Sequence, residues 1–247
     1  MVDAYIDALK NQKNGYSPSY GIESLRVAIS NFEKNQKNGG WNCNPSDVYI
    51  TSGVSEALLI LFASFLFPND KILTPGPFYP PYVSYPPIFK SSVIQYRLME
   101  EDNWKIDFDD IKKKLDNNVK LLCVINPNNP TGSVLEKDEI LKLIEIADEY
   151  PNCTIISDEI YNKFNFDNNH ISIASLSKKT PVITLNGISK GYFAPGWRIG
   201  YIAIHDPTDR LEYVRDGIEK LLRGRLSAPT PAQHGFLAAL NLSLIHI

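Results

Sequence analysis

The sequence predicts an α/β protein in three layers, with a mostly parallel sheet covered by helices on both faces. Short apolar runs alternate along the chain with segments of helical spacing, a pattern typical of strands joined by crossover helices. Runs such as 121–125 (LLCVI) and 154–157 (TIIS) contain no charged residue. Strands of that kind are typical of a parallel sheet that is buried on both faces.

The predicted elements follow one another from the N-terminus without an internal repeat or an obvious linker. A first amphipathic helix carries Ile22, Leu25, Ile29 and Phe32 on one face. Strands are expected at 48–50, 71–74, 92–98, 119–126, 154–157, 181–185 and 199–204, and further helices at about 55–65, 108–115, 137–150 and 208–222. We expect residues 1–13 to form an N-terminal linker helix and residues 14–247 to form one large domain.

The composition is that of an ordinary globular protein. The chain has 247 residues, 43% hydrophobic content and a net charge of −3, which suggests binding neither to nucleic acid nor to an anionic membrane. The longest apolar run, 57–67, is shorter than the ~20 residues that span a bilayer, and the charged N-terminus does not resemble a signal peptide. We therefore expect a cytoplasmic protein.

The cysteines and histidines give no metal or disulfide pattern. Cys43, Cys123 and Cys153 form no CxxC pair, and an odd number of cysteines is not typical of a disulfide framework. The four histidines are scattered without the spacing of metal ligands. We expect no metal site.

Polar residues directly follow several of the predicted strands. These segments are TSGVSEA (51–57), NPNNPTG (126–132), SDEIY (157–161) and NGISK (186–190). In a parallel α/β sheet, ligands bind at the carboxyl ends of the strands. The four segments are therefore the candidates for a binding site.

Lys190 stands in an unusual setting for a lysine. Ile188, Tyr192, Phe193 and Trp197 surround it in the sequence, whereas a solvated lysine usually has polar neighbours on a helix face. This setting predicts a buried amine with a chemical role.

Four of the residues together suit a pyridine aldehyde cofactor. An isolated Asp158 after a strand would most simply cap a turn. Here Tyr161 and Asn129 are available to donate to a phenolate oxygen, and Lys190 to form a Schiff base. Asp158 would then keep the ring nitrogen protonated, so that the ring accepts electrons.

These motifs resemble the class I/II aminotransferases, fold-type-I enzymes of amino acid metabolism that depend on pyridoxal 5′-phosphate (PLP). NPNNPTG, SDEIY and NGISKGYFAPGWRIGY, with Lys190 and Arg198, occur in the family's order and at comparable spacing. The resemblance runs from about Asn14 to beyond Arg225. It implies PLP as cofactor, an amino acid and a 2-oxo acid as substrates, and a homodimer. The sequence around Lys190 resembles that of alanine- or aspartate-type enzymes.

The resemblance also assigns a phosphate site. Gly53, Val54 and Ser55 would bind the phosphate at the positive N-terminus of the helix that follows. A serine N-cap followed by Glu56 is the simpler interpretation of this stretch, and both can hold together. Arg198 would bind the phosphate from another side, since a guanidinium pairs bidentately with phosphate oxygens; its alternative is a surface salt bridge.

Three further positions follow from the resemblance. Tyr79 in PGPFYPPY aligns best with the aromatic residue that stacks on the cofactor ring, although Phe78 and Tyr82 are neighbours that could be ordinary core aromatics. Gly187 replaces a serine that many family members use for phosphate, which makes Ser189 the candidate donor. Tyr16 aligns with a tyrosine that reaches the phosphate of the partner subunit, so the active site would be complete only in a dimer.

The chain is shorter than members of the family it resembles. We expect a fragment in which most of the C-terminal small domain is missing, including the arginine that binds the substrate α-carboxylate. Arg223 and Arg225 are the candidates for that role if the chain acts alone. The alternatives are another fold-type-I PLP reaction, such as that of a C–S lyase or a cyclopropane-forming synthase, and an inactive truncated remnant.

Overall fold

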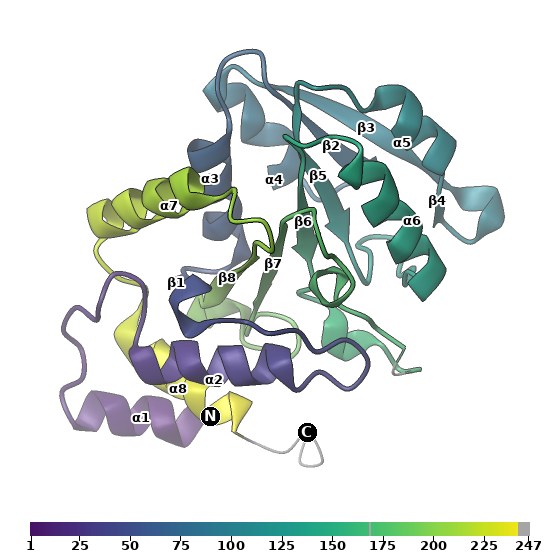
Figure 1. Cartoon of the computed structure of the whole chain (residues 1–247). Helices are drawn as coiled ribbons and strands as arrows, with labels where there is room; N and C mark the ends of the chain where they lie inside the picture. Colours follow the sequence, from purple (N-terminus) through teal and green to yellow (C-terminus); the bar gives the residue numbers. More distant parts are fainter. Residues whose placement is uncertain (168, 242–247) are drawn as a thin grey trace.

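The computed structural model describes residues 1–167 and 169–241, which form one eight-stranded sheet with helices on both faces (Figure 1). The strands are β1 (Val48–Thr51), β2 (Lys71–Gly76), β3 (Ser92–Met99), β4 (Lys105–Ile106), β5 (Val119–Ile125), β6 (Thr154–Asp158), β7 (Val182–Gly187) and β8 (Gly200–His205). Their order is β1-β8-β7-β6-β5-β2-β3-β4. Neighbours from β7 through to β3 are parallel, while β1, β8 and β4 pair antiparallel. The predicted, mostly parallel sheet is confirmed.

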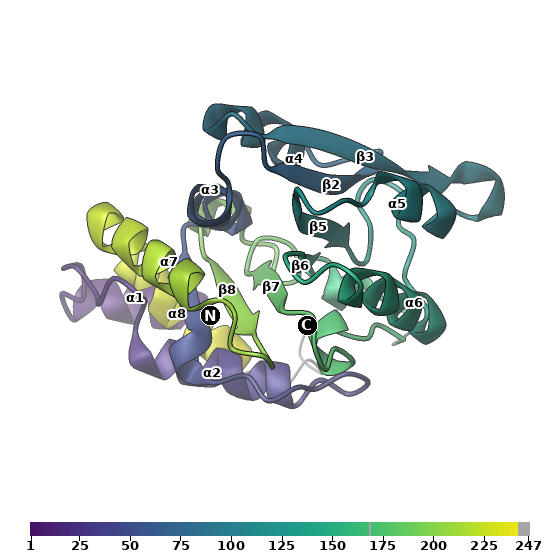
Figure 2. The same ribbon diagram turned by 45° about the horizontal axis from the view of Figure 1, so that its top comes forward.

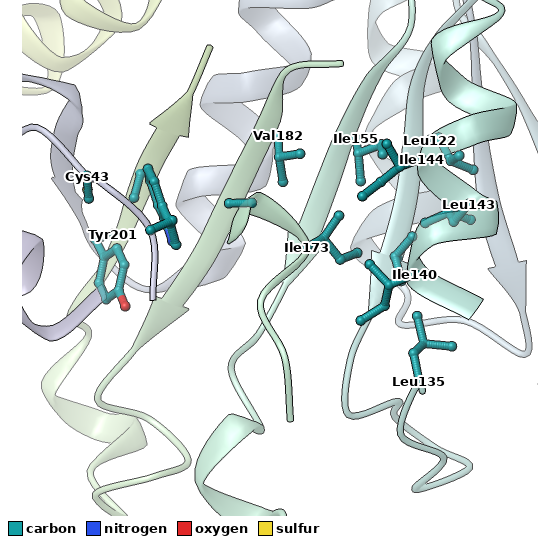
Figure 3. Close-up of a cluster of buried hydrophobic side chains, with 14 of the residues drawn as sticks. Cys43, Leu122, Leu135, Ile140, Leu143, Ile144, Ile155, Ile173, Val182 and Tyr201 are labelled. Atoms are coloured by element: carbon teal, nitrogen blue, oxygen red, sulfur yellow. The ribbon is translucent and has the colours of Figure 1, made fainter. Parts of the chain in front are cut away.

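The helices are α1 (Val2–Lys10), α2 (Glu23–Lys34), α3 (Val54–Phe65), α4 (Pro81–Ser84), α5 (Phe108–Lys114), α6 (Lys137–Asp148), α7 (Glu212–Arg225) and α8 (Thr230–Leu240). Figure 2 shows α3 and α7 side by side; they pack with α4 on one core cluster. Side chains of α2, α5, α6 and α8 belong to the other cluster, part of which Figure 3 shows. The three-layer arrangement is confirmed.

The strand β5 shows why both faces of the sheet are apolar. Successive side chains of a strand point to opposite faces. Leu122 and Val124 accordingly belong to one core cluster, and Leu121, Cys123 and Ile125 belong to the other. All five are buried, so the unbroken apolar run in the sequence reflects burial on both sides.

The short elements α4 and β4 were not predicted. The C-terminal part also differs from the prediction, which gave a helix at 208–222 and no element after it. The helix α7 begins only at Glu212, because the Asp206 carboxylate accepts hydrogen bonds from the backbone N–H groups of Arg210 and Leu211 and closes a turn there. The helix α8 was not predicted; it packs against α1 and α2 (Figure 1). The division of the chain at residue 13 stays a prediction, although α1 lies within the expected helix.

Two buried carboxyl groups lie on the α2 face of the sheet. Glu33 on α2 accepts a hydrogen bond from the Tyr201 hydroxyl of β8, and Glu159 accepts one from each of the Ser157 and Ser172 hydroxyls. Burial, together with repulsion from Glu159, raises the pKa of Glu33 to about 8, and burial raises the pKa of Glu159 to about 7. At least one of the two carboxyl groups therefore tends to stay protonated near neutral pH in the folded state.

The raised pKa of Glu33 predicts a stability that falls as pH rises. An acid whose folded pKa exceeds its unfolded value stabilises the fold fully below the unfolded pKa, here 4.5, and loses that stabilisation as pH rises through the folded pKa of about 8. Glu33→Gln cannot ionise at this position, so its unfolding free energy should fall less than that of the wild type between about pH 5 and pH 8. The two losses should differ by at least about 1.4 kcal/mol, the equivalent of one pKa unit. Denaturant titrations at several pH values measure this, and equal pH slopes for the two proteins would contradict it.

Candidate active site

A cavity of about 130 Å³ lies where β5, β6 and β7 end and α3 begins. Its lining residues are Val54, Ser55, Tyr79, Ile125, Asn129, Asp158, Ile160, Tyr161, Ser189, Lys190, Pro195 and Arg198. The carboxyl ends of parallel strands meet at one edge of a sheet, so the segments that follow them come together there. The structure therefore unites in one cavity most of the residues that the sequence singled out.

Asp158, the last residue of β6, is the buried acid of the cavity. Its carboxylate accepts hydrogen bonds from the Tyr82 hydroxyl at 3.1 Å and from the Ile160 backbone N–H at 3.3 Å. Burial raises the pKa of Asp158 to about 6, although both hydrogen bonds act in the opposite direction. Among the described residues no cation forms a salt bridge with it, which leaves the acid able to pair with a positive group in the cavity.

Tyr82 is a site residue whose role the sequence left open. The ring is fully buried against Phe62 and Tyr79, as expected of a core aromatic, yet its hydroxyl reaches Asp158. A tyrosine needs a hydrogen-bond partner when its hydroxyl is buried. Packing alone would be satisfied by a phenylalanine at this position. The presence of a tyrosine was therefore the feature of the sequence that indicated a partner for its hydroxyl.

The start of α3 forms one end of the cavity. Gly53 is the N-cap and has a positive φ of 85°, and no side chain caps the helix, so the interpretation of this stretch as a serine N-cap is wrong. The Ser55 hydroxyl lies 3.2 Å from the Tyr79 hydroxyl, and both residues line the cavity. The first N–H groups of a helix lack partners within the helix and attract anions.

Arg198 lies directly over this helix start. Its guanidinium donates to the Pro195 carbonyl at 2.8 Å and the Ser52 carbonyl at 3.2 Å, and it forms no salt bridge with any described residue. A Cβ at position 53 would lie 2.4 Å from its Nη2, so this placement requires glycine there. The alternative of a surface salt bridge is wrong, and the positive charge is free to bind an anion.

Lys190 lines the cavity but is exposed, so the expectation of a buried amine is wrong. The apolar neighbours that suggested burial pack elsewhere: Tyr192 contacts Phe236 of α8, and Trp197 packs against α1. The Lys190 Nζ lies 5.7 Å from the centroid of the Tyr161 ring, at the long end of cation–π distances. The amine therefore stands at the rim of the cavity.

The remaining predicted residues fall into two groups. Asn129 and Ser189 line the cavity. Tyr16 is 82% exposed and does not line it. Arg223 and Arg225 do not line it either, because each has a partner elsewhere in the chain: Glu219 for Arg223 and Glu56 for Arg225, both at 3.1 Å.

The described residues contain neither a membrane-spanning helix nor a cluster of metal ligands. In residues 1–167 and 169–241, no helix is long and apolar enough to cross a membrane. Over the same ranges, no three His, Cys, Asp or Glu side chains gather to hold a metal ion.

Comparison with known proteins decides the family. Residues 1–246 match the family model described as aminotransferase class I and II. The chain belongs to the class I and II aminotransferase family. The resemblance seen in the motifs is therefore confirmed for this aminotransferase-family chain over nearly its full length.

Its relatives include enzymes named for different amino acids and reactions. The chain is 35% identical over 239 residues to the glutamate-pyruvate aminotransferase AlaA of Escherichia coli (strain K12), covering 96% of this chain and 58% of the relative. It is 37% identical over 207 residues to the S-alkyl-thiohydroximate lyase SUR1 of Arabidopsis thaliana, covering 83% of this chain and 44% of the relative. This aminotransferase-family chain thus spans about half the length of these two curated relatives, 58% of one and 44% of the other.

A solved structure agrees with the fold. The alanine aminotransferase from Pyrococcus furiosus superposes with a TM-score of 0.95 at 43% sequence identity, covering 99% of this chain and 61% of that chain. The aminotransferase-family chain thus shares the fold of the matching part of that alanine aminotransferase over 99% of its own length.

Proposed function

We propose that this chain supplies the PLP-binding part of an aminotransferase that moves an amino group from an amino acid of the alanine or aspartate type to a 2-oxo acid. The observation that carries the proposal is that Lys190, Asp158 and Arg198, which come from different segments, line a single cavity. An amine, a buried acid and a guanidinium beside a helix N-terminus match the aldehyde, the ring nitrogen and the phosphate of PLP. These are the groups by which a protein binds this cofactor and tunes its electronics.

The residues present fit the cofactor at its phosphate end. Gly53 leaves room for the Arg198 guanidinium, whose fork can take two phosphate oxygens. The Ser55 and Ser189 hydroxyls and the N–H groups at the start of α3 supply further donors on the cavity wall. Together these groups offer a positive, donor-rich end suited to a phosphate.

At the other end, the residues fit the ring. When bound, PLP supplies an aldehyde that bonds to amines and a ring that accepts electrons released at the substrate Cα. Asp158 would hold a negative charge against the ring nitrogen, while Asn129 and Tyr161 would donate to the ring oxygen. Tyr79 would contact the ring face, and Tyr82 would orient Asp158 through its hydrogen bond.

Lys190 would bind the cofactor covalently and move a proton at its Nζ. A general base must come within hydrogen-bond distance of the proton that it removes, and it must also bind that proton. An exposed amine at the rim of the cavity can move towards or away from a bound cofactor and substrate. Ile125 and Ile160 on the cavity wall limit the access of water to the buried acid. Attachment of the cofactor and transfer of the proton would thus both be carried out by Lys190.

The proposal includes a homodimer in the cytoplasm. Tyr16 is 82% exposed, as a side chain that contacts a second subunit would be in an isolated chain. Cys43, Cys123 and Cys153 are free and buried, which agrees with a reducing compartment. A cross-link from position 16 to the partner's cavity would test the dimer.

Product analysis tests the reaction. With L-alanine or L-aspartate, 2-oxoglutarate and PLP, the whole protein that contains this chain should form glutamate and an equal amount of pyruvate or oxaloacetate, without ammonia. Ammonia and pyruvate released from an S-alkyl cysteine, with no need for a 2-oxo acid, would instead identify a C–S lyase. Absence of both products while PLP still binds would correspond to an inactive remnant. A reaction without 2-oxoglutarate is the control.

A further inference from the structure

Two turns beside the cavity contact each other through their side chains. One turn holds Tyr161 and continues into the 3-10 helix Asn162–Phe164; the other runs from Lys190 to Phe193. Lys190 lies over the Tyr161 ring, and the Phe164 and Phe193 rings meet at 5.8 Å between centroids. The second turn is closed by a hydrogen bond from the Phe193 N–H to the Lys190 carbonyl at 3.0 Å.

Lys163 lies in the first turn, between Tyr161 and Phe164 in the sequence. It has no carboxylate partner among the described residues. Its Nζ lies 3.5 Å from the centroid of the Tyr192 ring and 5.4 Å from that of the Phe32 ring. Burial in this aromatic setting lowers the pKa of Lys163 to about 8. Two rings thus fix the end of a side chain that would otherwise be mobile.

The stem of Lys163 packs directly on Gly191. A Cβ at position 191 would lie 2.7 Å from the Lys163 Cδ and 3.1 Å from its Cγ, so the missing side chain of the glycine makes room for the lysine. Gly191 immediately follows Lys190 in the sequence. The Lys163 stem therefore contacts the backbone one residue from the amine at the rim of the cavity.

We propose that Lys163 is a positioning residue for Lys190. Its stem fills the space over Gly191 and its ammonium is fixed by Tyr192, so the two turns are coupled and the Lys190 amine is directed at the cavity. The packing of the stem, rather than the charge, does the positioning. This inference rests on the proposed function, in which Lys190 bonds to the aldehyde of PLP.

A size-exchange experiment tests the contact. The rate at which PLP bonds covalently to Lys190 is followed by absorbance, and the bonded fraction is trapped with borohydride and mapped by mass spectrometry. Lys163→Ala and Gly191→Ala should each slow bonding about tenfold or more, since a shift of about 1 Å in a reacting group can cost about 100-fold. The double variant should recover most of the rate, because the added methyl occupies the space that the lysine leaves.

Two further variants separate packing from charge and from general damage. Lys163→Met keeps an unbranched stem that packs well on aromatic rings, and it should bond PLP within about twofold of the wild-type rate. Lys142→Ala is the matched control, because Lys142 also lies over a ring, that of Phe108 at 4.5 Å, but on α6. It should leave the rate unchanged. Thermal unfolding of every variant reports folding.

The outcomes distinguish this inference from the proposed function. A double variant no faster than either single one, or a slow Lys163→Met, would overturn the positioning role while wild-type trapping at Lys190 still supports the function. Wild-type protein that bonds no PLP at Lys190 would overturn both. Recovery of most of the rate in the double variant, with Lys142→Ala unchanged, is the result we expect.

Discussion

Lys190→Ala is expected to abolish covalent labelling of the cavity by PLP and borohydride. The variant removes the amine that we propose to bond to the aldehyde, and no other lysine lines the cavity in the described part of the chain. Reversible binding of PLP should remain, because Arg198, the start of α3 and Asp158 are untouched. Peptide mapping after reduction measures the labelling, and equilibrium dialysis measures the reversible binding.

Lys190→Arg is the matched control for charge. It keeps a positive group at the rim of the cavity but offers no nucleophilic amine, because an arginine side chain remains protonated. It should lose labelling as completely as Lys190→Ala does. If either variant still carried the label inside the cavity, the covalent role of Lys190 would be refuted, and the proposed function would need another attachment point.

The sheet was predictable because burial on both faces leaves a local signal. Runs such as 121–125 are apolar at every position, and so short a run between polar turns is typical of a buried strand. The polar segments after β5, β6 and β7 were predictable for the same reason. Each polar segment begins where the apolar run before it ends.

The helix α8 was not predictable, because distant contacts determine it. Its sequence contains Gly235 in the helix interior, which disfavours a helix in isolation. Gln233 is fully buried and accepts a hydrogen bond from the Ile22 N–H at 2.9 Å, and a Cβ at Gly235 would lie 2.5 Å from the Trp197 ring. These partners lie far from α8 in the sequence, so its local pattern does not reveal them.

The candidate site shows the same limit at the level of single side chains. The motifs identified Lys190, but its apolar neighbours wrongly suggested burial, because a sequence does not say which way each side chain of a turn points. Lys190 points to the cavity, while Tyr192 packs against Phe236 on the α8 side. The pairing of Glu33 with Tyr201 joins residues from α2 and β8 and was likewise invisible.

Asp158→Asn in the whole protein is expected to lose amino transfer far more than cofactor affinity. Removing one member of a buried charge pair costs about 3–5 kcal/mol, or about 10²–10⁴-fold in rate if the pair is needed in the transition state. The amide is close in size to the carboxyl group and can still accept from the Tyr82 hydroxyl. The phosphate end is unchanged, so PLP affinity should fall less than about tenfold. Steady-state rates and PLP titration measure the two quantities.

Tyr82→Phe separates the charge of Asp158 from its orientation. The variant removes the 3.1 Å hydrogen bond while leaving the carboxyl group and the packing of the ring. That hydrogen bond lowers the pKa of Asp158, so its loss should move the acid limb of the pH–rate profile upward. The rate at high pH should fall much less than in Asp158→Asn. If Asp158→Asn turned over as fast as wild type, the acid would not act on the ring, and the buried carboxyl group would be part of the core alone.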